Sequence, residues 1–493
     1  MRKRSTGLLA VGLAALLFAA GARADTTDII QPQNETPDQG FQAATCTAEV
    51  ADPGPPPQNC SVVTPGIIFR LAAGHPKVGF TQYTIEHEPF TPLESPPFPP
   101  GSMAAPIPGE DIKEHTIKTL RTELPPGLTV NPEATASRCS MDDFLNVVGE
   151  LIVPACAPET RTGTQKVTLV TNRPEVEVPG VGTIPIPGFV LPPTPGATEV
   201  PIYNLVPEPG EPAKLGFVIN GKVPVFLETE VAWESDFHES FTIKLLNTAE
   251  ATGLSTLISR LVSNGAEAGN GTYLTNPTTC FDSNQAAFEH LYSTWFRAES
   301  YADPDPQFPH GSTPVEAKLP KDPPGTGPRV TQEGCDSVPF EPSLDAAPTT
   351  GAIDSASGGT VTVSLPFDPA KEGGEANQSQ SHLRRAEVTL PPGMGLNPSG
   401  AKGLVACTDA QFKKGVRVYE NECPAASVIG SAEITSPPLA EPLVGDVYVG
   451  EQQSSDPESG RMFRILVEAK SEHEGIAVRL VGAVRADRAT GRL

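Results

Sequence analysis

The sequence predicts an all-β protein, built from tandem β-sandwich domains of the immunoglobulin-like kind with proline-rich linkers, short helical turns and disulfides. Three observations support this fold class. Proline and glycine number 55 and 45 of the 493 residues, polar and apolar residues alternate in many short runs, and there are eight cysteines. Frequent turn residues between short alternating runs are typical of sandwiches and argue against a coiled coil or a helical bundle.

Segments in which polar and apolar residues alternate are the expected strands. In the expected strand Tyr292–Tyr301, Trp295 is the predicted core residue. A helix is predicted for Thr248–Asn264, with a strand over Leu257–Ser263 as the alternative. The expected strands are Thr116–Glu123, Lys166–Thr171, Lys214–Ile219, Val223–Val231, Phe241–Leu246, Tyr292–Tyr301, Leu383–Leu390, Ser431–Thr435, Met462–Ala469 and Ile476–Val484.

The first 24 residues have the three parts of a secretory signal peptide. Basic residues 2–4 precede an apolar run, Gly7–Ala20, and Ala22 and Ala24 supply the small residues before a cleavage site. Removal of this segment leaves 31 Lys and Arg against 59 Asp and Glu, a net charge of −28. An acidic chain of this kind repels phosphate, so nucleic acid is excluded as a partner. Contact with a membrane is expected only through the signal peptide during export.

An even number of cysteines in an exported chain indicates a disulfide framework. Local spacing predicts the sequential pairs Cys46–Cys60, Cys139–Cys156, Cys280–Cys335 and Cys407–Cys423. A zinc site would require clusters of the C-x-x-C type, and the sequence has none. We therefore expect neither a metal nor a cofactor.

An internal duplication organises the chain. The run Leu124–Pro132, with the pattern L-P-P-G-x-x-aliphatic-N-P, recurs at Leu390–Pro398, and each copy is followed by C-[ST]-x-x-x-F and later by C-x6-G. A repeated unit should be closed within itself, which supports the pairs Cys139–Cys156 and Cys407–Cys423. We expect each cysteine loop to carry a single helical turn, capped by Ser140 or Thr408, and to build the fold rather than a catalytic site.

Composition and the duplication divide the chain into five segments. These are the signal peptide 1–24, a proline-rich segment 25–65 with a small cysteine loop, a first sandwich unit 66–282, a small β module 283–345 and a second sandwich unit 346–493. The second unit is expected to be a truncated copy with an unprotected sheet edge, because fewer residues follow its cysteine loop.

No motif of a known catalytic or phosphate-binding class is present. His115 and His382 precede the two copies of the repeat and are expected to be structural. His87 and His238 each have glutamate neighbours, but adjacent residues of a strand face opposite sides. Asp303-Pro304-Asp305 is a candidate calcium loop, with a solvated turn as the favoured alternative.

The repeat motifs also carry a resemblance. The L-P-P-G-M-G-L-N-P run at Leu390–Pro398, the C-T-x-x-Q-F run at Cys407–Phe412 and the V-Y-V-G run at Val447–Gly450 are similar to those of large, secreted repeat proteins of high-GC actinobacteria. The resemblance spans residue 66 to the C-terminus. It implies immunoglobulin-like repeats that continue past residue 493, an extracellular structural role and no catalytic residues.

Three functions are therefore considered. The first is an exported, non-enzymatic structural or adhesion-type protein, secreted or held at the cell surface, whose partner is an unknown surface ligand or cell-envelope component. The alternative is an extracellular module that binds polysaccharide or another ligand. The third is a secreted hydrolase that uses His115 or His382.

Overall fold

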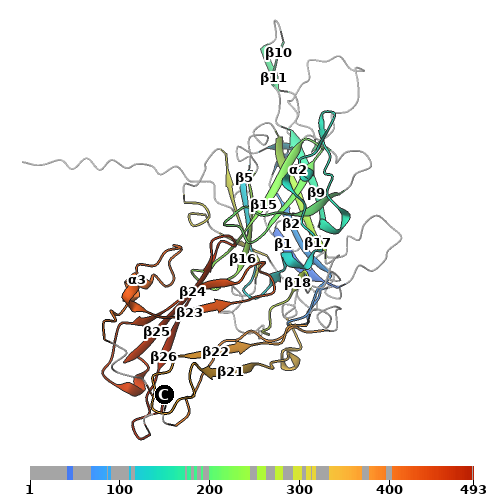
Figure 1. The fold of residues 1–493 in the computed structure, drawn as a ribbon. Helices are drawn as coiled ribbons and strands as arrows, with labels where there is room; N and C mark the ends of the chain where they lie inside the picture. The colour runs from blue at the N-terminus through green and yellow to red at the C-terminus, as the bar shows by residue number, and fades with distance from the viewer. Residues whose placement is uncertain are drawn as a thin grey trace, which may run out of the picture.

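The computed structural model describes residues 41–47, 68–85, 87–89, 110–112, 117–171, 175–178, 182–185, 190–191, 199–244, 252–262, 272–280, 293–301, 307–312, 314–317, 332–368, 377–392, 394–395, 402–490 and 492–493. They form an all-β protein, which confirms the predicted fold class (Figure 1). The two α-helices in these ranges have a single turn each, and no helix there could span a bilayer.

A sheet of twelve strands forms the first unit. The strands lie in the order β1-β2-β17-β9-β13-β14-β15-β16-β5-β19-β20, and β12 pairs with β9 to one side. Their bounds are β1 Phe41–Cys46, β2 Val78–Thr84, β5 Ile117–Glu123, β9 Arg161–Thr171, β12 Val190–Leu191, β13 Val200–Leu205, β14 Lys214–Ile219, β15 Val223–Val231, β16 Glu239–Lys244, β17 Thr252–Val262, β19 Trp295–Ser300 and β20 Val315–Glu316.

The second unit contains an antiparallel sheet of four strands, β23-β24-β25-β26, and the hairpin β21–β22 (Figure 1). Their bounds are β21 Ser343–Pro348, β22 Gly359–Ser364, β23 Val428–Ile434, β24 Leu443–Gly450, β25 Phe463–Ser471 and β26 Ile476–Val484. Short strands pair elsewhere: β3 His87–Pro89 with β4 Glu110–Ile112, β6 Thr129–Val130 with β18 Leu274–Thr275, β7 Val147–Val148 with β8 Leu151–Ile152, and β10 Glu175–Val178 with β11 Gly182–Pro185.

The first sheet curls until its two ends share one core. Phe41 and Tyr83 come from one end of the strand order, and Phe296 on β19 comes from the other. The ring centroid of Phe296 lies 5.3 Å from that of Phe41 and 4.7 Å from that of Tyr83. The Tyr83 hydroxyl also bonds Thr122 on β5. The sequence also predicts that each unit is a sandwich of two packed sheets, and this arrangement remains a prediction.

The order β9-β13-β14-β15 in the first sheet is repeated by β23-β24-β25-β26 in the second. Gly163 and Gly430, the glycines of the repeated C-x6-G pattern, both adjoin a break in strand register. The break leaves Thr162 and Ile429 without a residue opposite them. The same irregularity at the same position of two strands indicates one building block used twice.

Each copy has a single-turn helix, α2 (Met141–Phe144) or α3 (Asp409–Phe412). The side chains of Ser140 and Thr408 cap these helices, each accepting the backbone N–H of the third residue after it at 3.1 and 3.2 Å. Such caps satisfy backbone donors that a short helix leaves free. The capping predicted from the sequence is therefore present in both copies.

A disulfide closes each helix-bearing loop, and we call the loop with its disulfide the stapled turn. The bonds Cys139–Cys156 and Cys407–Cys423 have Cα separations of 5.3 and 5.0 Å. The backbone N–H of Cys139 donates to β13 at 2.8 Å, and that of Cys407 donates to β24 at 2.9 Å. The stapled turn is thus tied to the second strand of the repeated four-strand block in both copies.

A buried phenylalanine joins each stapled turn to its sheet. Phe144 and Phe412 are both 0 % exposed. The Phe144 ring lies 6.2 Å from Tyr203 at 70°, and the Phe412 ring lies 6.4 Å from Tyr448 at 67°. These edge-on contacts cover the same face of each sheet with the same chemistry.

The predicted helix over Thr248–Asn264 is wrong, because this region contains strand β17. Its residues pair with β9 on one side and with β2 on the other. A strand inside a sheet carries apolar residues on both faces, so its pattern also matches one side of a helix. The alternation of polar and apolar residues over Leu257–Ser263 indicated the strand correctly.

Two further expectations are wrong. Leu383–Leu390 is not a strand; its counterpart in the first unit, β5, is held by β16 and β19, whereas no described strand pairs with this segment. Trp295 is only partly buried, and the core residue of β19 is Phe296, at 0 % exposure. Neighbouring strand residues face opposite sides, so the error is a shift of one position.

Three strands belong to the first sheet although the sequence analysis placed their residues in other segments. The segment 25–65 supplies β1, and 283–345 supplies β19 and β20, all of which belong to the first sheet. The signal peptide 1–24 lies outside the described residues. The domain limits themselves remain predictions.

Removal of either disulfide tests the equivalence of the stapled turns. Replacing Cys407 and Cys423 by alanine should lower the free energy of unfolding of the second unit by about 3 kcal/mol, because the unfolded chain regains the entropy of a loop of this length. The matched change at Cys139 and Cys156 should cost the first unit a similar amount. Scanning calorimetry would measure both, and a cost confined to one copy would contradict the equivalence.

Candidate functional site

Three of the predicted cysteine pairs are disulfides in the structure: Cys139–Cys156, Cys280–Cys335 and Cys407–Cys423. Cys46 is disulfide-bonded as well. Its predicted partner, Cys60, lies outside the described residues. The described cysteines are therefore structural, and none is a free thiol.

The histidines singled out in the sequence lie in separate parts of the chain where the structure describes them. His382 is exposed on an unpaired segment, and His87 lies on β3. His238 contacts Asp236 at 2.5 Å rather than its neighbour Glu239, and this bond raises the pKa of His238. His115 lies outside the described residues.

The candidate calcium loop Asp303-Pro304-Asp305 lies outside the described residues as well. Within the ranges that are described, no three His, Cys, Asp or Glu side chains come together as metal ligands.

His75 is a buried histidine that the sequence did not single out. It is 2 % exposed, and its Nδ1 lies 2.7 Å from the Thr272 hydroxyl and 3.2 Å from that of Thr275. Burial lowers the pKa of His75 to about 4, so the ring is neutral at ordinary pH. Its contacts fix the loop around β18, which is a structural role.

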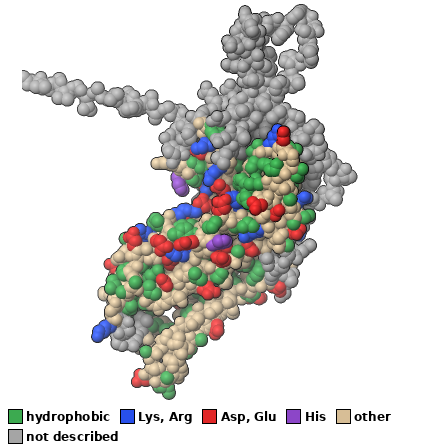
Figure 2. Space-filling model, turned by 45° about the horizontal axis from the view of Figure 1, so that its top comes forward, with side chains coloured by type: hydrophobic (Ala, Val, Ile, Leu, Met, Phe, Trp, Pro, Cys, Tyr) green, Lys and Arg blue, Asp and Glu red, His purple; other side chains and the backbone are tan. Residues whose placement is uncertain are grey.

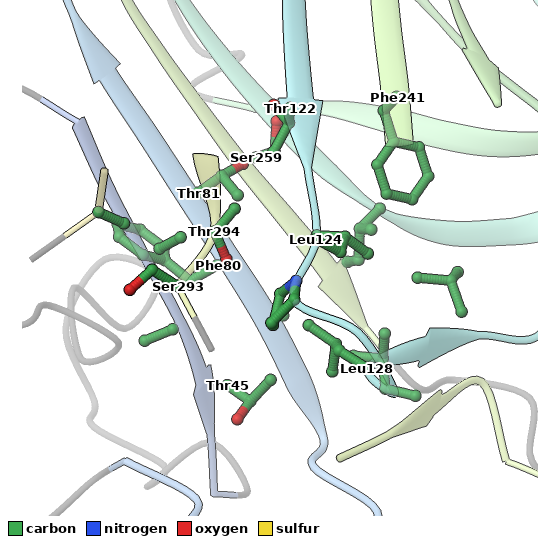
Figure 3. A pocket seen from close by; sticks show the side chains of 18 of the residues that line it. Thr45, Phe80, Thr81, Thr122, Leu124, Leu128, Phe241, Ser259, Ser293 and Thr294 are labelled. Atoms are coloured by element: carbon green, nitrogen blue, oxygen red, sulfur yellow. The ribbon is translucent and has the colours of Figure 1, made fainter. Parts of the chain in front are cut away.

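An apolar cavity of about 180 Å³ lies inside the curled sheet of the first unit. Figure 3 shows Thr45, Phe80 and Thr81 on one wall and Leu124 and Phe241 on the other. The cavity therefore separates β1 and β2 from β5 and β16, the two ends of the sheet that meet across the core.

Several polar side chains around this cavity are already bonded to protein. Thr45 donates to Asn276 at 3.0 Å, Ser259 donates to Gln165 at 2.7 Å, and Thr122 bonds Tyr83. What remains for a ligand is mainly carbon surface, which suits an apolar molecule. An apolar cavity of about 150 Å³ in another protein accepts benzene, so this space is large enough for a small ligand.

The two units meet at a cluster of aromatic and arginine side chains. Trp233, in the loop after β15, is 7 % exposed. From the second unit, the guanidinium groups of Arg417 and Arg479 lie 5.5 and 5.7 Å from its ring centroid, and the Tyr419 ring lies 5.8 Å away. A partly desolvated indole between two cations is a favourable cation–π arrangement.

Arg479 is fixed by the second unit itself. It pairs with the buried Glu468 at 2.8 Å and donates to four backbone carbonyls of the segment 413–419. Arg417 extends from this segment to Glu230 and Glu234 of the first unit. The charges at the junction are therefore paired on both sides, as burial requires.

A second cavity, of about 290 Å³, lies beside this cluster and is lined by both units. Phe241 and Tyr273 of the first unit face it, and so do Leu443 and Ile476 of the second. The walls are mainly apolar, with two carboxyl groups among them, those of Glu230 and Glu239.

Glu239 borders the cavity and is half-buried. Burial raises its pKa to about 8, and the single backbone bond that it accepts, from Val130 at 2.9 Å, offsets this effect only in part. The carboxyl is therefore protonated at neutral pH. Glu230 lines the same cavity, but it is paired with Arg121 and Arg417.

No protein-family model, curated protein or solved structure matches this chain. Its function is therefore argued from the arrangement of its own residues.

The stability of the protein should fall as pH rises because of Glu239. Between pH 4.5 and 8 the folded protein keeps a proton that the unfolded chain has lost, so the free energy of unfolding should decrease by up to about 1.4 kcal/mol per pH unit. Glu239→Gln should remove this slope while keeping an acceptor for the N–H of Val130. Denaturant unfolding from pH 5 to 8 would measure it.

The matched control is Glu228→Gln, which removes a surface ion pair with Lys244. This change should have little effect on stability at any pH in the series. Identical slopes for the wild type and Glu239→Gln would show that the junction carboxyl does not hold a proton.

Proposed function

We propose that this protein is an exported, non-enzymatic structural or adhesion-type protein, located in the medium or at the cell surface, in which repeated disulfide-stapled β units are held in fixed relative positions. The chain's own features support this reading: a signal-like N-terminus, a duplicated unit and disulfides in both copies.

The single observation that carries the proposal is the packing of Trp233 from the first unit against Arg417 and Arg479 of the second. Domains that work independently are usually joined by exposed, flexible linkers. Here a desolvated aromatic side chain and paired charges join two copies of one unit, which suits a protein whose task depends on shape.

A second contact supports the same reading. The Gly210 N–H in the first unit donates to the carbonyl of His473 in the second at 2.9 Å. A Cβ atom at Gly475 would lie 2.0 Å from the Gly210 carbonyl oxygen, and the φ of Gly475 is +67°. Glycine alone allows the two backbones to approach this closely.

Fractionation of producing cells tests the location. The protein should be recovered from the medium or the cell surface, should begin at Asp25, and should show no cysteine that reacts with an alkylating agent before reduction. Recovery from the cytosol with reactive thiols would contradict the proposal.

The junction itself is tested by Trp233→Ala. Loss of the cation–π and ring contacts should cost about 3 kcal/mol and should split a shared unfolding transition into two in scanning calorimetry. Trp295→Ala, on β19 away from the junction, is the control and should leave the units coupled. A single transition in both variants, or in neither, would contradict the role given to Trp233.

The apolar cavity of the first unit favours a second candidate, a module that binds a small apolar ligand. Polysaccharide has less support, because no described Trp or Tyr is fully exposed and sugars bind to such rings. 1-Octanol should bind at one site in calorimetric titration, and Ala43→Leu, which fills the cavity, should weaken binding by about tenfold. The control Ala483→Leu lies on the second sheet and should bind normally. Equal binding by both variants would exclude this candidate.

A further inference from the structure

The cavity of about 290 Å³ between the two units takes no part in the contacts that join them. It is lined by β16 of the first sheet and by β24 and β26 of the second, and we call it the junction cavity. Figure 1 shows β16 beside β24. An apolar cavity of about 150 Å³ in another protein accepts benzene, so the junction cavity has room for one molecule somewhat larger than benzene.

Both units supply apolar side chains to the wall of the junction cavity. Leu215 and Phe241 come from the first unit, and Leu439, Leu443 and Ile476 come from the second. Leu443 and Ile476 are almost fully covered, at 2 and 5 % exposure. A water molecule in a cavity needs several polar partners, and carbon walls offer few of them. The body of a ligand in this space would therefore be apolar.

Glu239 places a carboxyl group in this apolar wall. It lies two residues before Phe241 on β16, and alternate residues of a strand face the same side. Its Oε2 accepts the backbone N–H of Val130 at 2.9 Å, and no other described group bonds the carboxyl. Burial raises its pKa to about 8, so it holds a proton at neutral pH. Because Oε2 is an acceptor, the proton lies on Oε1, which is a donor without an acceptor among the described residues.

Two other polar side chains of the wall are already engaged. Glu230 is paired with Arg121 at 2.7 Å and with Arg417. The Thr229 hydroxyl bonds the backbone of Ala213. Figure 2 shows acidic and basic side chains interspersed over the visible face of the described part of the molecule. A charged ligand would gain little by leaving such a surface for the cavity, because burial removes its hydration, so a neutral ligand suits the cavity better.

We propose that the junction cavity binds a small, neutral, largely apolar molecule with a carbonyl oxygen, such as a ketone, and that Glu239 donates a hydrogen bond to this oxygen. The carbonyl supplies the acceptor that the carboxyl lacks. Because its carbon body packs against both units, the ligand stabilises their contact. The site differs from the cavity inside the first unit, although Val130 and Phe241 border both, and it does not depend on export or adhesion.

Acetophenone and cumene are matched probes, because they have nearly the same size and only acetophenone carries a carbonyl. Isothermal titration of the full chain at neutral pH should show saturable binding of acetophenone. Glu239→Met removes the donor and should weaken acetophenone binding at least about tenfold, whereas cumene should bind as it does to the wild type. No saturable binding of acetophenone by the wild type, or unchanged binding by Glu239→Met, would overturn the proposal.

A pH series tests which group donates the hydrogen bond. Between pH 7 and 9.5 the wild type should lose at least about tenfold in affinity for acetophenone, because Glu239 loses the proton that it donates. Glu239→Gln keeps a donor in its amide and should bind equally across the range. Wild-type affinity that is independent of pH, or that rises with pH, would contradict the role of the carboxyl.

The surroundings of Glu239 make this series specific. The second unit lines the junction cavity with uncharged side chains, and Glu230 on β15 is paired with arginine. Burial raises the pKa of Tyr273, so its hydroxyl stays protonated. His238 is the neighbour of Glu239 on the chain and bonds Asp236. Any effect of its titration would persist in Glu239→Gln, which separates it from the effect of the carboxyl.

Ala213→Leu tests the position of the site. Ala213 is 8 % exposed and lines the junction cavity, so a leucine there should occupy the space and weaken acetophenone binding by about tenfold. The matched control is Ala43→Leu, which fills the cavity inside the first unit and should bind acetophenone like the wild type. The reverse pattern would place the ligand inside the first unit and overturn the proposal.

Discussion

An antiparallel sheet must bury the apolar side chains on its faces, and this constraint explains most of the structure. In both units one face is covered locally, by a disulfide-closed turn that carries one phenylalanine into the sheet. The other face needs residues from distant parts of the chain. The first unit obtains them by curling twelve strands around one core, whereas the second has four strands and a partly open face.

The same constraint explains how the two units are joined. Near the junction, Val231 of the first unit packs against Leu443, Ala469 and Ile476 of the second, on the face that is open farther along. Trp233 and its two arginine neighbours continue this contact into polar surroundings. The junction therefore contributes to the fold of the second unit and is more than a link between independent domains.

The sequence predicted those features that depend on local pattern. The predicted strand limits Lys214–Ile219, Val223–Val231 and Ile476–Val484 agree with the structure. The repeat, its helical turns and the disulfides Cys139–Cys156 and Cys407–Cys423 agree as well. Features that depend on distant contacts could not be predicted. The pattern of β17 is ambiguous until β2 and β9 flank it. Leu383–Leu390 pairs with no described strand despite its alternation, and the two cavities exist only where separate segments meet.

Hydrogen exchange of the chain alone, read residue by residue, tests the central claim most directly. If one building block is used twice but completed once, the amides of Gly163–Val167 should be protected throughout. Those of the corresponding stretch, Gly430–Ile434, should alternate between protected groups that face β24 and exchanging groups at the open edge. Uniform and equal protection of both stretches would show that the second sheet is already complete and would contradict this account.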